Sequence, residues 1–205
     1  NNISVKMLRI IALVAAILVI AMTMSCEEDE PSVVATTDIF NLPIGTKWVY
    51  ANDVDTDTVV YEYLDTMMLN NEVVAQIAVT DASTKLYVQR GNQIYSYGEI
   101  DTDLGVIIEF PQPTIEFVFD TDIGFRWIRS VLVFGFRGSS LFRVEMEVVE
   151  KEIVTTPAGT FECDVIEDEF GVLFYVAPEG VVRRVFMDRV DDEIVTVTES
   201  LVEIR

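Results

Sequence analysis

Hydrophobic and polar residues alternate over most of the chain, which is the pattern of β-strands with one buried face. The alternation is clearest between residues 141 and 154. There Phe142, Val144 and Met146 are predicted to face the core, and the charged residues between them to face water. No segment after residue 26 shows the period of an amphipathic helix. The predicted strands are 46–50, 58–64, 72–80, 85–89, 93–97, 127–137, 141–154, 161–166, 172–176, 181–187 and 194–204.

Short polar turns such as Asn70-Asn71 and Gly91-Asn92 separate these strands, which favours hairpins between sequence neighbours. The region 106–119 is different because Pro111 and Pro113 cannot donate to a central ladder. It is predicted to form two short edge strands or a crossing loop, with any helix confined to 110–125. The fold class is therefore all-β: one strongly curved antiparallel sheet or half-barrel of roughly ten to twelve strands.

An unbroken apolar run from Ile10 to Met24 precedes all of these strands. Lys6 and Arg9 stand before it and Ser25-Cys26 after it, which is the layout of an exported lipoprotein precursor. The run is shorter than the ~20 residues that span a bilayer comfortably. We therefore predict a signal peptide at 1–25, a lipidated acidic tether at 26–37 and a β domain at 38–205. An uncleaved membrane anchor is the alternative.

Cys26 is the predicted lipidation site, and four acidic residues follow it directly. This acidic tether resembles that of Bacteroidota lipoproteins, and the resemblance implies a lipid-anchored outer-membrane protein on the periplasmic or cell-surface face. The alternative is that the acids only keep a linker solvated and extended. In both interpretations the first predicted partner is the membrane, contacted through the lipid on Cys26.

Composition excludes several classes of function. The formal net charge of −21 argues against nucleic acid as a partner. The sequence contains no histidine, which removes the commonest general base and every imidazole metal site. If Cys26 carries lipid, Cys163 is the remaining thiol, and it is expected to be a small buried hydrophobic residue. We therefore expect a protein that is not an enzyme and uses no cofactor.

One acidic stretch has the alternating oxygen ligands of a calcium loop. Asp53, Asp55 and Asp57 supply them, but the sixth place is not glycine and the twelfth is Leu64 where such loops have glutamate. An acidic hairpin tip is the simpler interpretation. The sequence thus predicts no metal site, and this stretch is the weak calcium candidate.

Aromatic residues are the remaining candidates for binding. Many occur at every second position of a predicted strand, so several must share a face. Core filling is the default explanation. The alternative is a cleft on the concave side of the sheet, covered by the 110–125 segment, that takes a hydrophobic or glycan ligand. The candidate ligand-binding residues are Trp48, Tyr50, Tyr61, Tyr63 and Trp127.

Three segments resemble uncharacterised lipoproteins of the Bacteroidota. They are 43–50, 154–163 with its Pro-Ala-Gly-Thr-Phe motif, and 174–183 with its aromatic-x-Ala-Pro turn, in which Glu179 stands where that family often has glycine. The resemblance implies a curved sheet like that of periplasmic lipoprotein carriers, and it implies no reaction. By themselves, Pro157 and Gly159 predict a hairpin corner.

Two functions from different classes remain. The first is a non-catalytic binding module of an outer-membrane or cell-surface lipoprotein, with a hydrophobic small molecule, peptide or glycan as its ligand. The second is a structural or interaction subunit of an envelope protein complex, which docks its partner through a strand edge or an acidic face.

Overall fold

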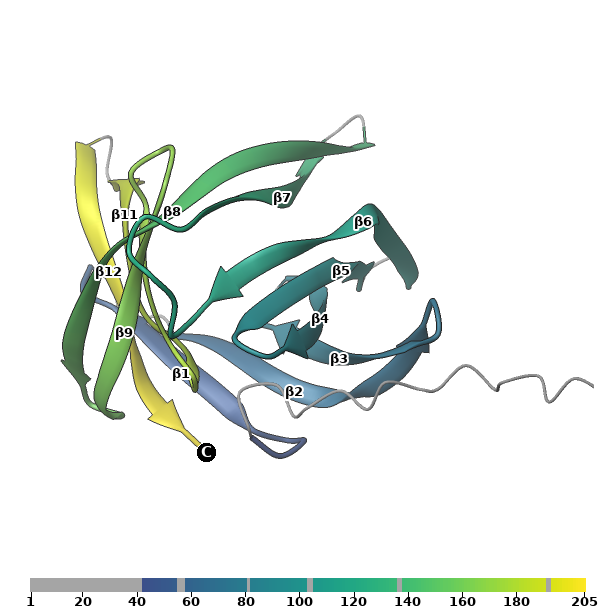
Figure 1. The fold of residues 1–205 in the computed structure, drawn as a ribbon, viewed down its shortest axis with the longest axis horizontal. Helices are drawn as coiled ribbons and strands as arrows, with labels where there is room; N and C mark the ends of the chain where they lie inside the picture. The colour runs from purple at the N-terminus through teal and green to yellow at the C-terminus, as the bar shows by residue number, and fades with distance from the viewer. Residues whose placement is uncertain (1–41, 55–57, 81, 103–104, 136–137, 191–192) are drawn as a thin grey trace, which may run out of the picture. The chain divides into compact units, whose positions relative to one another are not determined.

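The computed structural model describes residues 42–54, 58–80, 82–102, 105–135, 138–190 and 193–205. They form a twelve-stranded antiparallel sheet and its turns (Figure 1). The strands are β1 (Lys47–Asn52), β2 (Thr58–Leu69), β3 (Glu72–Val79), β4 (Thr84–Arg90), β5 (Gln93–Asp101), β6 (Val106–Val118), β7 (Arg126–Gly135), β8 (Gly138–Thr156), β9 (Gly159–Asp168), β10 (Leu173–Ala177), β11 (Gly180–Val190) and β12 (Glu193–Ile204). The predicted fold class is confirmed.

The strand order is β6-β5-β4-β3-β2-β1-β12-β11-β10-β9-β8-β7. Most neighbours in the sheet are therefore also neighbours in the sequence, as the short turns predict. The exception is the pair β1 and β12, in which Trp48 lies opposite Ile204 and Tyr50 opposite Leu201. The first and last strands thus meet in the middle of the sheet, and the two edges are the consecutive strands β6 and β7.

The two edges approach each other without forming a ladder in the described part of the chain. The indole N–H of Trp127 donates to the carbonyl of Ile115 at 3.0 Å, and the backbone N–H of Ser130 donates to Thr114 Oγ1 at 3.3 Å. Side chains therefore make the connections that strand pairing makes elsewhere, and the curved sheet is nearly closed.

The proline-containing region is one continuous edge strand, which confirms the predicted edge position but not the predicted division into two short strands. Pro111 and Pro113 lie within β6, where a missing N–H leaves no ladder bond unmade on the free side. A register shift against β5 falls between Ser96 and Gly98. Gly98 has φ +141°, and a Cβ there would clash with the carbonyl oxygen of Ile108. The prediction of a crossing loop or short helix is wrong.

The strand alternation places most predicted core residues correctly. Val144 and Met146 are 6% and 1% exposed and join the largest hydrophobic cluster, together with Trp127 and Phe174. Phe142 is 54% exposed, so its predicted place in the core is wrong. The reason is that β9 pairs with β8 only from Met146 onward, which leaves the first part of β8 uncovered.

The predicted corner between β8 and β9 is present, with Gly159 at φ +149°. Beyond it Cys163 is 3% exposed, and burial raises the pKa of its thiol to about 12, with neighbouring carboxylates adding to the effect. This thiol is a packing residue, as predicted. No helix of the described residues is long and apolar enough to span a membrane.

Candidate functional site

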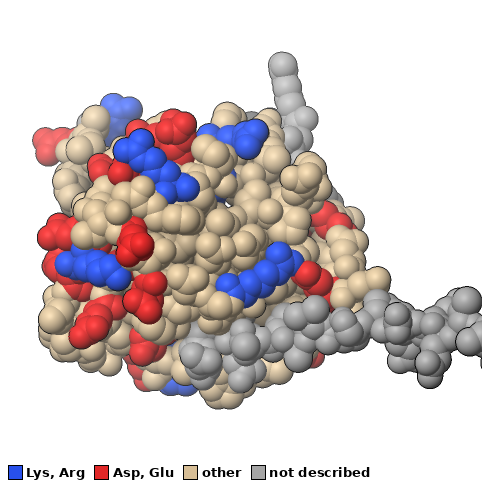
Figure 2. Space-filling model, viewed as in Figure 1, with Lys and Arg blue, Asp and Glu red and all other residues tan. Residues whose placement is uncertain are grey.

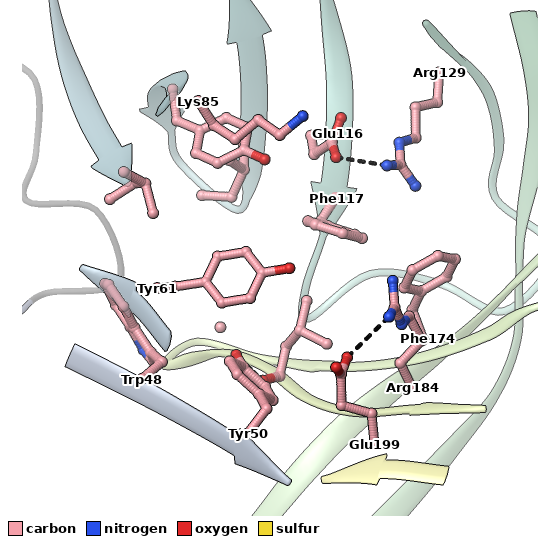
Figure 3. A pocket seen from close by; sticks show the side chains of 15 residues that line it. Trp48, Tyr50, Tyr61, Lys85, Glu116, Phe117, Arg129, Phe174, Arg184 and Glu199 are labelled. Carbon is pink, nitrogen blue, oxygen red and sulfur yellow. Dashed lines mark hydrogen bonds and ion pairs between the residues drawn. The ribbon is translucent and has the colours of Figure 1, made fainter. Parts of the chain in front are cut away.

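The curved sheet encloses a cavity of about 240 Å³ (Figure 3). Its walls come from ten strands, β1 to β7 and β10 to β12, which belong to both halves of the sheet. Aromatic rings and charged side chains share these walls. The lining residues are Trp48, Tyr50, Tyr61, Ile77, Lys85, Tyr87, Ile94, Glu116, Phe117, Arg129, Phe174, Gly180, Val181, Arg184 and Glu199.

Two aromatic side chains of β1 form a fixed floor. The Trp48 indole N–H donates to the carbonyl of Glu179 at 2.9 Å, and the Tyr50 hydroxyl donates to the carbonyl of Val181 at 2.7 Å. Both side chains are buried, and burial, together with the nearby Tyr61, raises the pKa of Tyr50 well above its ordinary value. These bonds pin the β10–β11 turn against β1, so this side of the cavity is preorganised.

Tyr61 packs on this floor and presents a polar group to the cavity. Its ring meets that of Tyr50 edge to face, with centroids 5.3 Å apart. Its hydroxyl points into the cavity and makes no hydrogen bond to the described residues (Figure 3). Tyr87 also lines the cavity, and burial raises the pKa of both phenols. Both hydroxyls are therefore neutral donors at physiological pH.

Two arginine–glutamate pairs occupy the opposite wall (Figure 3). Arg129 of β7 lies 2.8 Å from Glu116 of β6, and Arg184 of β11 lies 3.1 Å from Glu199 of β12. The Nε atoms of both arginines are buried without a hydrogen-bond partner in the described part of the chain. Each guanidinium thus keeps a donor whose desolvation is not compensated.

Arg129 also joins the charged wall to the aromatic one. Its guanidinium carbon lies 5.5 Å from the ring centroids of both Phe117 and Phe174. Burial by itself lowers the pKa of Arg129, but the Glu116 carboxylate outweighs this, and the pKa is raised above its ordinary value. The side chain is therefore a permanent cation in contact with two neighbouring rings, whose centroids are 5.5 Å apart.

The five candidate residues from the sequence fall into two groups. Trp48, Tyr50 and Tyr61 come together at the cavity. Tyr63 does not line it and packs in the neighbouring cluster with Trp48, at 4% exposure. Trp127 is buried where β6 and β7 approach each other. The 110–125 segment is no lid, because Glu116 and Phe117 belong to the cavity wall.

The predicted lipidation and calcium sites fall almost wholly outside the described residues. Cys26, Asp55 and Asp57 lie outside them, as do the predicted signal peptide and tether. Asp53 is described: its carboxylate accepts the backbone N–H of Thr198 at 2.8 Å, and this bond lowers its pKa. No group of three or more metal-ligating side chains occurs in the described part of the chain.

The charged residues of the cavity were missed by the sequence analysis. Arg129 stands two places from Trp127 and from Val131, so period-two alternation puts it on their inward face. An arginine at an inward-facing position of a strand was the signal that could have predicted a polar cavity. On the outside, Figure 2 shows acidic and basic side chains next to one another around an area of uncharged residues.

No protein-family model matches the sequence, and no curated protein matches it. Three solved structures are similar in fold. A candidate lipoprotein from Parabacteroides distasonis has a TM-score of 0.46 at 15% identity, over 80% of this chain and 96% of that one. A candidate exported protein with a YmcC-like fold from Bacteroides fragilis gives 0.43 at 15%, over 80% and 96%. The hypothetical lipoprotein YmcC from Escherichia coli gives 0.38 at 11%, over 84% and 90%.

Proposed function

We propose that this chain is the non-catalytic binding module of a lipid-anchored envelope protein, and that its ligand is a small glycan bound in the cavity. The observation that carries the proposal is the composition of the cavity walls. Aromatic rings and two arginine–glutamate pairs line the same cavity. A sugar ring offers the matching surfaces, since its C–H face packs on aromatic rings while its hydroxyls both donate and accept.

The same walls favour a glycan over the acyl chain or apolar peptide that the sequence also allows. An acyl chain would displace water from four charged side chains and form no hydrogen bonds with them, which makes its free energy of binding unfavourable. These side chains are Glu116, Arg129, Arg184 and Glu199. A volume of about 240 Å³ also lies just below the usual range for pockets that hold drug-sized ligands. The proposed ligand is therefore of monosaccharide to disaccharide size.

The pairing of the two cavity carboxylates supports a non-catalytic role. Glu116 and Glu199 each bind an arginine, at 2.8 Å and 3.1 Å. A glycoside hydrolase uses two carboxyl groups that flank the scissile bond and act on the substrate. We therefore propose recognition without turnover.

The ligand proposal is tested by titrating the purified protein with cellobiose and chitobiose while following tryptophan fluorescence, with lauric acid as the apolar comparison. We expect the sugars to shift the emission of the buried Trp48 and lauric acid to leave it unchanged. Tyr61→Phe removes a hydroxyl that points into the cavity and should weaken binding about fivefold.

The matched control is Tyr175→Phe, which removes the same atom from a tyrosine that does not line the cavity. It should bind like the unaltered protein. Saturable binding of lauric acid in place of the sugars would refute the glycan assignment. Equal effects of the two substitutions would refute the assigned cavity.

The anchor is proposed from the sequence around Cys26. Cys26→Ala should abolish incorporation of labelled palmitate and release the protein from membranes, and label that persists in this variant contradicts the assignment. Protease treatment of intact cells distinguishes the two faces of the outer membrane. Degradation indicates the cell surface, and complete resistance indicates the periplasmic face.

A structural or interaction subunit remains the second candidate function. The observation in its favour is that β6 and β7 are sheet edges. A partner strand would have to separate them at Ile115 and Trp127, which are joined by a hydrogen bond. Purification of the intact protein with one stoichiometric envelope protein and an empty cavity would favour this function.

A further inference from the structure

The outer end of the β7–β8 hairpin has no neighbouring strand in the described part of the chain. Its ladder continues from Val131 opposite Phe142 to Gly135 opposite Gly138. On one side β9 begins to pair with β8 only at Met146, and on the other side β6 forms no ladder with β7. Figure 1 shows these residues as a separate arm at the top of the view. We call residues 131–135 and 138–143 the distal hairpin.

The distal hairpin exposes apolar side chains on both faces. Phe142 and Val133 follow the inward register of Trp127 and Met146, yet they are 54% and 48% exposed. Leu141 has the opposite register and is 43% exposed. A strand pair with one apolar face is explained by packing on a core. Exposure on both faces indicates a medium or partner that surrounds the tip.

The charge of this hairpin is opposite to that of the whole protein. Its residues, 131–135 and 138–143, hold one arginine and no carboxylate, in a chain whose formal net charge is −21. Arg143 is exposed and forms no ion pair with the described residues. In the alternation of β8, Arg143 shares its face with Leu141, and Phe142 lies between them on the other face.

We propose that the distal hairpin docks this domain on the surface of a lipid bilayer, with Phe142, Leu141 and Val133 in the interfacial region and Arg143 at the lipid phosphates. A second protein or a second copy would cover one face of a two-stranded arm, whereas a bilayer interface covers both. The unpaired strand edges limit how deeply the hairpin can enter the bilayer, because their backbone N–H and C=O groups need water or lipid headgroups as hydrogen-bond partners. The arm therefore lies among the headgroups and does not cross the membrane.

The test places the photo-crosslinking amino acid p-benzoylphenylalanine at position 142 in the full chain. The control carries it at Phe170, an aromatic residue at the β9–β10 turn that is even more exposed, at 75%. Both proteins are added to vesicles of phosphatidylcholine with and without phosphatidylglycerol, irradiated, and examined by mass spectrometry. Both sites are exposed, so the circular dichroism spectra should match that of the unaltered protein.

We expect lipid adducts at position 142 in several-fold excess over position 170, with a higher yield on the anionic vesicles. Arg143→Glu should lower that yield about tenfold on anionic vesicles and leave it unchanged on phosphatidylcholine alone. Equal lipid adducts at both positions, or adducts at 142 that join two copies of the chain, would overturn the proposal. An Arg143→Glu variant with unaltered yield would overturn the assigned phosphate contact.

Discussion

Breaking the ion pair between Glu116 and Arg129 should destabilise this protein more than breaking an exposed pair, because the pair is buried and spans the two sheet edges. The side chains are 9% and 19% exposed and lie 2.8 Å apart. Glu116→Gln keeps the size of the side chain but leaves a buried guanidinium without its counter-ion. Removal of one partner from a buried pair costs about 3–5 kcal/mol. The rings of Phe117 and Phe174 still flank the cation, so we expect a loss near the lower end, about 3 kcal/mol.

Urea unfolding, monitored by circular dichroism, measures this loss. The urea midpoints of the variants are compared, and the slope of unfolding free energy against urea concentration should stay unchanged. The matched control is Glu62→Gln, which breaks the Lys47–Glu62 pair, whose side chains are 38% and 34% exposed. That pair should be worth at most about 1 kcal/mol. If Glu116→Gln costs no more than Glu62→Gln, the reasoning that burial makes the difference is refuted.

A double variant tests the mechanism of this loss. Glu116→Leu with Arg129→Met replaces both charges by apolar side chains, so no buried charge is left unpaired. It should be less destabilised than Glu116→Gln alone. A loss that is larger than that of the single variant would mean that the Coulombic attraction itself, and not the cost of an orphaned charge, is what stabilises the closure.

Three further predictions concern buried groups. Gly98→Ala should lower the free energy of unfolding by about 3 kcal/mol or more, because the new Cβ would clash with the Ile108 backbone. Gly45→Ala has open space around it and should lower it by only about 1 kcal/mol, through backbone strain. Urea unfolding measures both losses, and equal losses would contradict the clash. Cys163, with its pKa raised to about 12, should not react with iodoacetamide at pH 8 until urea unfolds the protein. Tyr50 and Tyr87 have raised pKa values, so above about pH 10 the unfolded chain releases protons that the folded chain keeps, and stability should fall as the pH rises. Absorbance at the tyrosinate band should show these two phenols ionising only on unfolding.

The strands were predictable because each signal was local. Period-two alternation marked eleven of the twelve strands, all but β6. Asn70 and Asn71 marked a tight turn whose residues both have positive φ, at 51° and 64°. The prolines of β6 correctly indicated an edge. Phe142 was placed wrongly for a different reason: alternation shows which way a side chain points, but only the neighbouring strand decides whether that side is covered.

The cavity could be predicted only in its aromatic half. Trp48, Tyr50 and Tyr61 belong to paired strands, and their alternation placed them on one face. Arg184 and Glu199 are fifteen residues apart in sequence and become partners through the register of β11 with β12, in which they lie directly opposite. That register follows from the turn and from burial on both strands, so a sequence without known pairing gives no reason to match these two charges.

The pairing of β1 with β12 has a consequence for when this domain can fold. Every other ladder joins strands that leave a ribosome or a translocation channel one after the other, whereas β1 has to wait for the last strand of the sheet. Contacts of such long sequence separation form slowly, because the intervening chain must first be brought together. Until then each half of the sheet lacks its partner at the centre. A chain that crosses a membrane unfolded and from its N-terminus gains by this arrangement, since its sheet cannot be completed before the whole domain has passed through.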